Sequence, residues 1–452
     1  KQFRPKLSIA VYHSYQNAIE IKRILTQSLN DYDVRFGGCY MWEVPYRPFM
    51  LYAIPKNKTA TRPKIIFTTP VLKFPAIGGP ALRIENSIKA LSNAADVFLI
   101  SRAPLDTFGG IEGKNHWGKL VSEFHFAPNP NSGDDEAAER GNAAFVYSIA
   151  QAENISTIWC GFGNISFYFI DELRRLDKNL ILIYDTDSVW SRFVLREVET
   201  KKNEKEKQQI ILSGLNKELE EQVLVAYTNF TTAVSEIDAD YYRGLTDEPH
   251  KVKLFSNVID LNNYPEFIAP PRGFRTPALF VAGSFYAQTS PMVFGTAWLI
   301  NEVLPIVVSK IPNVHLYIVG NGSQTYFKNS ANVTVTGQVD SVLPYLCNSS
   351  AALVPLFYES GTRFKILEAG ACKKAVVSTA LGAEGIEISH GKDILIADTP
   401  IAFAESIIEL INNNEINKQL GENLYKLISK NFSVNALRNQ ALEIFHSINK
   451  KH

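Results

Sequence analysis

A short segment in the last quarter of the chain places charged residues at the start of a predicted helix. Gly361, Thr362 and Arg363 open this helix, and Lys365 and Glu368 lie on its first two turns. A helix start offers free backbone N–H groups and a partial positive charge, both of which favour phosphate. Gly361 allows close backbone approach, and the two basic side chains add full positive charges. The pattern therefore indicates a diphosphate site.

Glu368 extends this interpretation from a diphosphate to a nucleotide. It lies one helical turn after Lys365, where a carboxylate can accept hydrogen bonds from the hydroxyl groups of a ribose. The alternative is an ordinary helix whose Arg363 and Lys365 are simply solvated on its outer face. These residues alone do not decide between the two, so the surrounding elements have to do so.

Composition excludes several classes of protein. The chain has 452 residues, which predicts two domains rather than one. Lys plus Arg and Asp plus Glu both number 46, so no net charge directs the protein to nucleic acid. We expect no membrane span and no signal peptide, and hence a cytoplasmic protein. The four cysteines form no CxxC pair, so neither a zinc site nor a disulfide framework is indicated.

Short apolar runs alternate with helical patterns, as they do in βαβ units with parallel sheets. The first series has strand-like runs at 64–69, 96–101, 156–160, 180–185, 229–235 and 251–260. The second has them at 278–283, 314–320, 333–337, 351–356 and 375–379. Residues 261–277 between the series are rich in Pro and Asn and predict a linker. We therefore expect two doubly wound domains, with the ligand between them at the carboxyl ends of the strands.

Three segments fit this scheme less well. Residues 7–29 predict one extra strand and helix, whereas the aromatic stretch 38–55 shows no regular pattern. Residues 189–226 form a charged helical stretch, most simply a solvated helical face. We expect 38–55 and the loop 103–120 to supply acceptor or membrane-surface contacts, although isolated aromatic runs more often belong to a core.

The segment GTRFKILEAGACKKAVVSTALGAEGI at 361–386 resembles the nucleotide-sugar motif of retaining glycosyltransferases of family 4. It is similar in particular to the branch with Gly-Thr-Arg-x-Lys-x-Leu-Glu-Ala. Further resemblances follow in the expected order at 231–242, 255–264, 279–305 and 333–356. The resemblance implies the GT-B fold, an α/β architecture of two Rossmann-like doubly wound domains facing a central cleft.

The resemblance also implies an organisation into parts. These are an N-terminal extension of uncertain role, an acceptor-side domain, a linker, a nucleotide-sugar-binding domain, and a final helix packing back on the acceptor-side domain. Their expected bounds are 1–63, 64–260, 261–277, 278–432 and 433–452.

Roles in donor binding follow from the same resemblance. Glu368 would hold the ribose hydroxyls, and the loop of Gly361, Thr362 and Arg363 would contact the sugar and the phosphates. The other donor-site residues that it implies are Gly78 and Gly79 at the diphosphate, Gln338 and Val339 at the base, and Gly283 and Ser284 in the first loop of the second domain. The alternatives are that Gly78 and Gly79 form only a tight turn, and that Gln338 merely begins a loop.

Two departures from the family pattern concern the donor. The family's first glutamate lies eight positions before the second, and Ser360 stands there, with Glu359 one place earlier. Either residue could contact the donor sugar. The segment 283–292 also lacks the family's basic pair, so Arg363 and Lys365 are expected to neutralise the leaving diphosphate.

A third departure concerns the acceptor side. Many family members have a histidine after the strand that corresponds to 180–185, where this chain has Asp185, Thr186 and Asp187. One of the two carboxylates, with Asp187 favoured, could orient the acceptor hydroxyl or support positive charge on the sugar ring. The alternative is that Asp187 caps the following helix.

The implied function is transfer of a sugar from a nucleoside-diphosphate sugar to a glycan or lipid-linked glycan acceptor in cell-surface polysaccharide synthesis. Uridine is expected more than guanosine, and neither a cofactor nor a metal is expected. A peripheral position at the inner face of the cell membrane is a further hypothesis. Two alternatives stay open, namely an inactive nucleotide-binding or scaffold protein of the same fold and a nucleotide-sugar epimerase.

Overall fold

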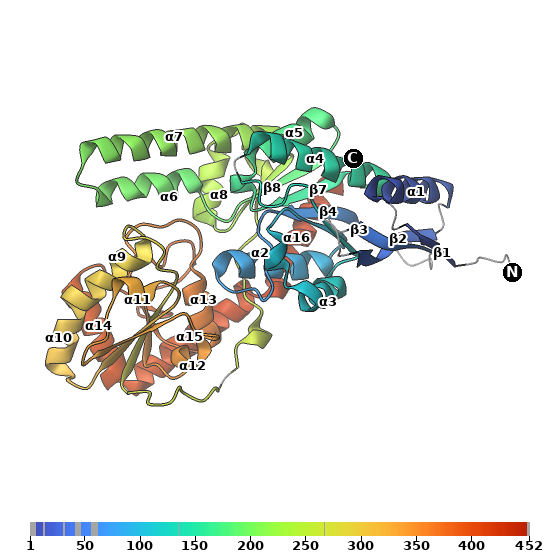
Figure 1. Ribbon diagram of the computed structural model, residues 1–452. Coiled ribbons are helices and arrows are strands. Elements are labelled where there is room, and N and C mark those ends of the chain that lie inside the picture. The colour runs from blue at the N-terminus through green and yellow to red at the C-terminus, as the bar shows by residue number, and fades with distance from the viewer. Residues whose placement is uncertain are drawn as a thin grey trace.

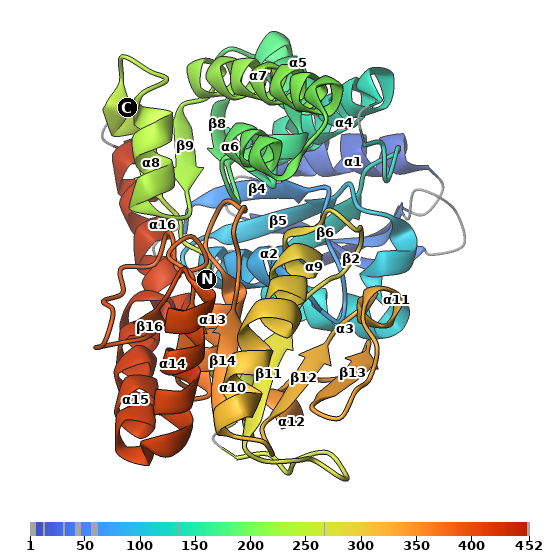
Figure 2. The same cartoon turned by 90° about the vertical axis from the view of Figure 1, so that its left-hand side faces the viewer.

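The protein contains two parallel sheets, each covered by helices, and a small antiparallel sheet near the N-terminus (Figures 1 and 2). The computed structural model describes residues 6–11, 14–29, 32–40, 47–55, 62–133, 135–265 and 267–449. Residues 41–46, which belong to the aromatic stretch 38–55, lie outside the described residues.

The first parallel sheet has seven strands in the order β10-β9-β8-β7-β4-β5-β6. Its strands are β4 (Lys64–Thr69), β5 (Asp96–Ser101), β6 (Glu123–Phe126), β7 (Thr157–Gly161), β8 (Ile181–Asp185), β9 (Phe230–Ala233) and β10 (Val252–Leu254). They are apolar and almost wholly buried because helices cover both faces. The covering helices include α2 (Gly79–Ser92), α3 (Gly110–Leu120), α4 (Glu136–Glu153), α5 (Phe167–Leu176) and α8 (Glu236–Arg243).

The second parallel sheet has six strands in the order β13-β12-β11-β14-β15-β16. They are β11 (Ala278–Ala282), β12 (His315–Val319), β13 (Val333–Gly337), β14 (Ala351–Val354), β15 (Val376–Ser378) and β16 (Leu395–Ile396). Its helices include α11 (Ser323–Tyr326), α12 (Leu343–Leu346), α13 (Phe364–Ala371), α14 (Pro400–Asn412) and α15 (Asn414–Asn431). The order places β11 and β14 at the centre, so the loops that follow them lie side by side.

One helix of the second domain bears on the expectation that the chain contains no membrane span. Residues Pro291–Lys310 form a continuous helix through α9 (Pro291–Trp298), a π-helical turn (Leu299–Val303) and α10 (Leu304–Lys310). By length and composition alone this helix could cross a membrane. However, Val293, Leu299 and Val307 are buried in the core of the second domain, so here it serves as a core helix.

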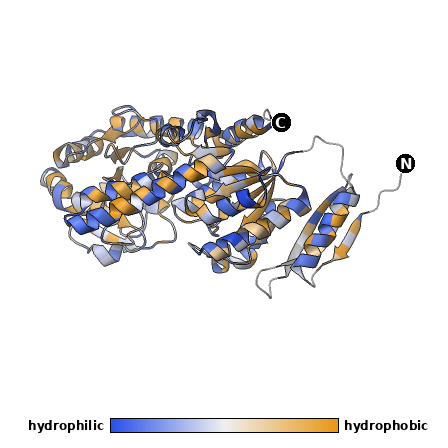
Figure 3. Cartoon of the chain, turned by 90° about the horizontal axis from the view of Figure 1, so that it is seen from above, coloured by the Kyte–Doolittle hydropathy of each residue, from blue (hydrophilic) through white to orange (hydrophobic). Residues whose placement is uncertain are grey.

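The N-terminal extension forms a small module at one end of the molecule (Figure 3). It contains β1 (Leu7–Ala10), α1 (Tyr15–Ser28), β2 (Tyr32–Tyr40) and β3 (Arg47–Pro55), with the strands in the antiparallel order β1-β3-β2. The expected strand and helix at 7–29 are therefore present. The expectation of irregular structure over 38–55 was wrong for the described residues, which end β2 and form β3.

Buried charges join this module to the first domain. Lys22 of α1 is fully buried and forms ion pairs with Glu123, at 2.6 Å, and with Glu153. The backbone N–H of Phe36 donates to Glu123 as well, at 2.7 Å. A buried cation without such partners would cost several kcal/mol, so these contacts make the module an integral part of the first domain.

Two other expectations about local structure need correction. Most of the supposed loop 103–120 is helical, because Gly109 and Gly110 turn the chain into α3, which buries Trp117. The charged stretch 189–226 is a hairpin of α6 (Trp190–Arg196) and α7 (Glu204–Tyr227) joined by a 3-10 turn (Glu197–Thr200). Gly214 allows the two helices to approach, since a β-carbon there would lie 2.5 Å from the Leu195 side chain.

The chain crosses between the domains twice. The second crossing leads into α16 (Val434–Asn449), which packs against α2 in the core of the first domain (Figure 2). The crossings contact each other, because the backbone N–H of Ile259 donates to the carbonyl oxygen of Phe432 at 3.0 Å. The two connections therefore run together on one side of the junction.

Candidate functional site

The carboxyl ends of the strands in both domains meet around the start of α13. Gly361 has φ of +78°, which favours glycine, and a β-carbon there would lie 2.7 Å from the carbonyl oxygen of Asp187. Gly79, at the start of α2, also lies close to the second domain, because a β-carbon there would lie 3.2 Å from the ring of Phe364. The structure thus brings the motif, the glycine loop and the segment after β8 together.

Arg363 is buried, and its side chain bonds to backbone atoms of the protein. Its side chain donates hydrogen bonds to the carbonyl oxygens of Gly361 and of Leu381, the latter at 3.4 Å. Burial lowers the pKa of its guanidinium, and the nearby charge of Glu359 opposes that effect. Arg363 therefore fixes the shape of the loop in this structure, which the sequence did not reveal.

Lys365 is in a different situation on the same helix. Within the described part of the chain, its ammonium group has neither a hydrogen bond nor an ion pair, although the side chain is half-buried. Burial lowers its pKa, and Glu359 is the carboxylate that most opposes this shift. An amine that is partly desolvated and unpaired favours an anionic ligand.

Glu368 is bonded to a residue from the segment before the second domain. The hydroxyl group of Tyr264 donates to Glu368 Oε1 at 3.1 Å. Burial raises the pKa of Glu368, and this hydrogen bond partly offsets the shift. Tyr264 was missed because the aperiodic segment around the linker gives no indication of where its side chains point.

The structure separates the two candidates for the family's first glutamate. The hydroxyl oxygen of Ser360 accepts a hydrogen bond from the backbone N–H of Val189, at 3.2 Å. The carbonyl oxygen of Glu359 accepts one from Arg196, at 2.5 Å, whereas its carboxylate has no bonded partner among the described residues. Ser360 is thus engaged by the first domain, and the Glu359 carboxylate is free for a ligand.

The two aspartates at the end of β8 differ in the same way. Asp185 is fully buried, and its Oδ1 accepts hydrogen bonds from Arg83 and Thr232, each at 2.6 Å. Asp187 is half-buried, and the indole N–H of Trp190 donates to its carboxylate over a long distance of 3.3 Å. Burial raises the pKa of Asp187 to about 6, while Arg83 acts against the shift. Asp185 therefore maintains the fold, and Asp187 remains available.

The alternative role of Asp187 as a helix cap does not hold. The N-cap of α6 is Val189, and the first backbone N–H groups of the helix donate to Glu221 of α7 instead. The distances from Glu221 Oε1 are 2.8 Å to the nitrogen of Trp190 and 3.3 Å to that of Ser191. A carboxylate from the neighbouring helix thus takes the place of a local cap.

Arg83 is a residue that the sequence analysis missed. It is buried on α2 and donates to Asp185, to the carbonyl oxygen of Thr186 at 2.7 Å, and to Asn257 at 2.8 Å. These bonds fix α2, whose first residues are the glycine loop, relative to the end of β8 and to the segment after β10. The only indication in the sequence is an arginine four residues after the second glycine of the Gly-Gly pair.

The remaining predicted residues lie at the ends of β11 and β13. The backbone N–H of Gly283 donates to Val319 at 3.1 Å, and the next residue, Ser284, is exposed. Gln338 is exposed directly after β13, and Val339 packs on the core of the second domain. All four residues thus lie at the carboxyl ends of the parallel strands, as the loop before α13 does.

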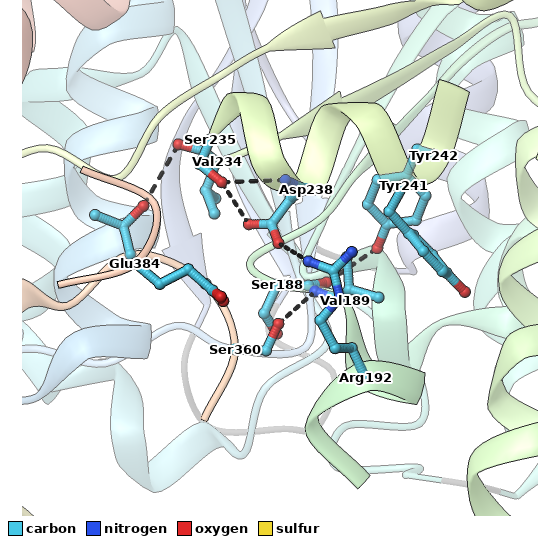
Figure 4. A network of polar contacts seen from close by, with 12 residues as sticks. Ser188, Val189, Arg192, Val234, Ser235, Asp238, Tyr241, Tyr242, Ser360 and Glu384 are labelled. Carbon is cyan, nitrogen blue, oxygen red and sulfur yellow. Dashed lines mark hydrogen bonds and ion pairs between the residues drawn. The ribbon is translucent and has the colours of Figure 1, made fainter. Parts of the chain in front are cut away.

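Polar contacts also join the domains beside the motif (Figure 4). The hydroxyl group of Thr362 donates to the carbonyl oxygen of Val234 at 3.5 Å. Within the first domain, Arg192 pairs with Asp238 at 3.6 Å, close to Ser360 of the second domain. Across the described residues, no group of three or more His, Cys, Asp or Glu side chains could hold a metal ion.

Comparisons with known structures identify the architecture. A sucrose-phosphate synthase from Thermosynechococcus elongatus has a TM-score of 0.64 with 14% sequence identity, over 86% of this chain and 100% of that one. Anabaena HepE in complex with UDP and glucose has a TM-score of 0.57 with 14% identity, over 85% and 99%. The chain has the GT-B fold.

Comparisons of sequence concern mainly the second domain. Residues 276–413 match the family model described as glycosyl transferases group 1. An uncharacterized glycosyltransferase of Methanocaldococcus jannaschii is 36% identical over 195 residues, which are 40% of this chain and 54% of that protein. An uncharacterized 44.6 kDa protein in the cps region of Klebsiella pneumoniae is 28% identical over 166 residues, 34% and 42% of the two chains. The GT-B chain spans about half the length of these curated relatives.

Proposed function

We propose that this GT-B protein is a retaining glycosyltransferase of family 4. It moves a sugar from a nucleoside-diphosphate sugar, with UDP favoured over GDP, to a glycan or lipid-linked glycan in cell-surface polysaccharide synthesis. The match of 276–413 to glycosyl transferases group 1 supports the class of reaction. The observation that carries the proposal is Lys365, a half-buried amine that has no bonded partner among the described residues and whose charge interacts with the carboxylate of Glu359.

In this proposal each motif residue has a separate task. Lys365 and the free N–H groups at the start of α13 bind the diphosphate. Glu368, held by Tyr264, accepts hydrogen bonds from the ribose hydroxyls, and the free carboxylate of Glu359 accepts them from the transferred sugar. Arg363 acts indirectly, by holding the loop in which Gly361 approaches the ligand.

The reaction proceeds on one face of the sugar. The bond between the anomeric carbon and the diphosphate breaks while the acceptor oxygen attacks from the same side, and the departing phosphate takes the acceptor's proton. Lys365 and the helix start stabilise the negative charge that develops on the diphosphate, so no metal is required. Asp187 is ionised above about pH 6 and orients the acceptor hydroxyl.

Calorimetry with UDP, GDP and ADP in the absence of metal tests the donor site. We expect one nucleotide to bind the wild type and both Glu368→Ala and Lys365→Met to weaken it at least about tenfold. Lys392→Met, at an exposed lysine of the same domain, serves as the matched control. If no nucleotide binds, or if the control loses as much affinity as the variants, the proposal is wrong.

An assay of turnover distinguishes a glycosyltransferase from an inactive scaffold protein and from an epimerase. Release of nucleotide from the cognate nucleotide-sugar, with the sugar appearing on an acceptor, is expected only for a transferase. Binding without any release supports the inactive scaffold, and a changed sugar that stays attached to the nucleotide supports an epimerase.

The peripheral position at the inner membrane face is tested by flotation with anionic liposomes. The expected result is that the protein rises with the vesicles at low salt and less so at high salt. Failure to co-migrate at low salt contradicts this part of the proposal.

A further inference from the structure

Helix α6 of the first domain contacts the second domain through its last residue, Arg196. The guanidinium of Arg196 binds both carboxylate oxygens of Glu384, in the loop after β15, at 2.7 and 2.8 Å. Burial alone raises the pKa of Glu384, but the hydrogen bonds and charge of Arg196 outweigh it and hold that pKa below its ordinary value. A bidentate pair of this kind has a defined geometry as well as an attraction.

Arg196 also contacts the loop before α13. The same guanidinium donates to the carbonyl oxygen of Glu359 at 2.5 Å. At the other end of α6, the backbone N–H of Val189 donates to Ser360. Two consecutive residues of the second domain are therefore held by opposite ends of one helix of the first domain.

The position of α6 is itself determined by the first domain. Glu221 of α7 accepts hydrogen bonds from the backbone at the start of α6 and from the hydroxyl groups of Ser191 and Tyr241, at 2.6 and 2.7 Å. Arg192, one turn before Arg196, pairs with Asp238 of α8. The helix thus belongs to a rigid part of the first domain, and it can hold the Glu359–Ser360 loop only while the two domains are in contact.

We propose that Arg196 is a positioning residue that couples contact between the domains to the placement of Glu359. The inference rests on the proposed function, in which the Glu359 carboxylate binds the transferred sugar. When the domains separate, the loop loses its bonds to both ends of α6, and the carboxylate is no longer held beside Lys365. The sugar is then placed for reaction only when the first domain, which brings the acceptor, is in position.

This role predicts a division between binding and turnover. In the proposed function Lys365 and Glu368 bind the nucleotide and lie on α13, whereas Arg196 bonds to Glu359, before this helix, and to Glu384, after β15. Arg196→Ala should therefore lower kcat by about 10- to 100-fold and change the affinity for UDP by less than about threefold. A loss of affinity as large as the loss in kcat would contradict the role, because Arg196 would then act on the whole donor site.

Hydrogen exchange followed by mass spectrometry measures the coupling without any need for activity. Peptides that cover 357–363 should exchange at least about tenfold faster in Arg196→Ala than in the wild type, whereas β14 peptides should not change. Arg243→Ala is the matched control, since Arg243 also forms ion pairs, with Glu236 and Asp240, but entirely within the first domain.

A conservative variant guards against simple misfolding. Arg196→Lys keeps a cationic donor for the carbonyl oxygen of Glu359, so the exchange rate of 357–363 should be lower than in Arg196→Ala, although the bidentate geometry is lost. Unchanged exchange in Arg196→Ala, or exchange in Arg196→Lys as fast as in Arg196→Ala, overturns the inference. A wild type that binds no nucleotide overturns the proposed function, while the exchange rates still decide whether Arg196 holds the loop.

Discussion

Charged residues in the interior of the first domain and those around the start of α13 are used in opposite ways. In the first domain, Arg83 and Asp185 are buried and bonded to each other, as are Lys22 and Glu123. In the second domain, Lys365 and the carboxylate of Glu359 have no bonded partner in the described structure, although both are half-buried. Buried and paired charges hold elements together, whereas partly desolvated and unpaired ones mark where a ligand supplies the partner.

The role of the paired charges in the first domain is tested by Arg83→Ala. This change leaves Asp185 buried without its cation, so the free energy of unfolding should fall by about 3–5 kcal/mol, as measured by urea denaturation. Arg175→Ala removes an exposed arginine of α5 and should cost less than about 0.5 kcal/mol. A similar loss for both variants would mean that the buried pair has no special part in the fold.

The role of the unpaired charges around the start of α13 is tested by Lys365→Met, which keeps an unbranched side chain of similar length. We expect nucleotide affinity to fall by about 10- to 100-fold, because charge-assisted hydrogen bonds to the diphosphate are lost. The free energy of unfolding should stay the same or rise, since a desolvated amine is removed. Both quantities come from calorimetry and denaturation of the same sample. A clear destabilisation would show that Lys365 has a structural partner.

Glu359 and Ser360 allow the same comparison between a free and a bonded side chain within one loop. Glu359→Gln should lower kcat/KM by about tenfold if the charged carboxylate binds the sugar hydroxyls. Ser360→Ala removes only the acceptor for the backbone N–H of Val189 and should have a smaller effect on kcat/KM than Glu359→Gln. Steady-state kinetics with the cognate donor distinguish the two, and the reverse order would assign sugar binding to Ser360.

Asp187 gives the smallest effect, which depends on pH. Its pKa is raised from 3.8 to about 6, so the folded protein binds this proton more tightly than the unfolded chain. The resulting stability is present below about pH 4 and is lost as pH rises through about 6. Asp187→Asn should therefore be more stable than the wild type at pH 7.5, by about 1–2 kcal/mol, with little difference near pH 4. Parallel pH profiles of stability would contradict this assignment.

The fold class could be predicted from sequence because buried parallel strands and helices alternate with distinct periods. The end of β2 was harder to predict, because Gly37 and Gly38 lie within this strand and glycine is depleted in strands. In the structure a β-carbon on Gly37 would lie 2.4 Å from the ring of Tyr52, so the glycine makes room for an aromatic side chain on the neighbouring strand. Such cross-strand packing has no local pattern in the sequence.

In the candidate site, too, local features could be predicted from the sequence and distant contacts could not. The motif residues on α13 were found because their spacing follows one local helix. Contacts between segments more than a hundred residues apart, such as Tyr264 with Glu368 and Arg196 with Glu384, were not found. Their positions depend on how the two domains meet, and one sequence without structure contains no record of that arrangement.

The return of α16 to the first domain has a consequence for protein synthesis. Leu437, Ile444 and Phe445 of this helix are buried in the same core as strands β4 and β5. Domains generally fold in order as the chain leaves the ribosome, but this core is incomplete until its last helix has been translated. The second domain, which needs no residue of α16 for its own core, is therefore expected to finish folding before the domain that precedes it in the sequence.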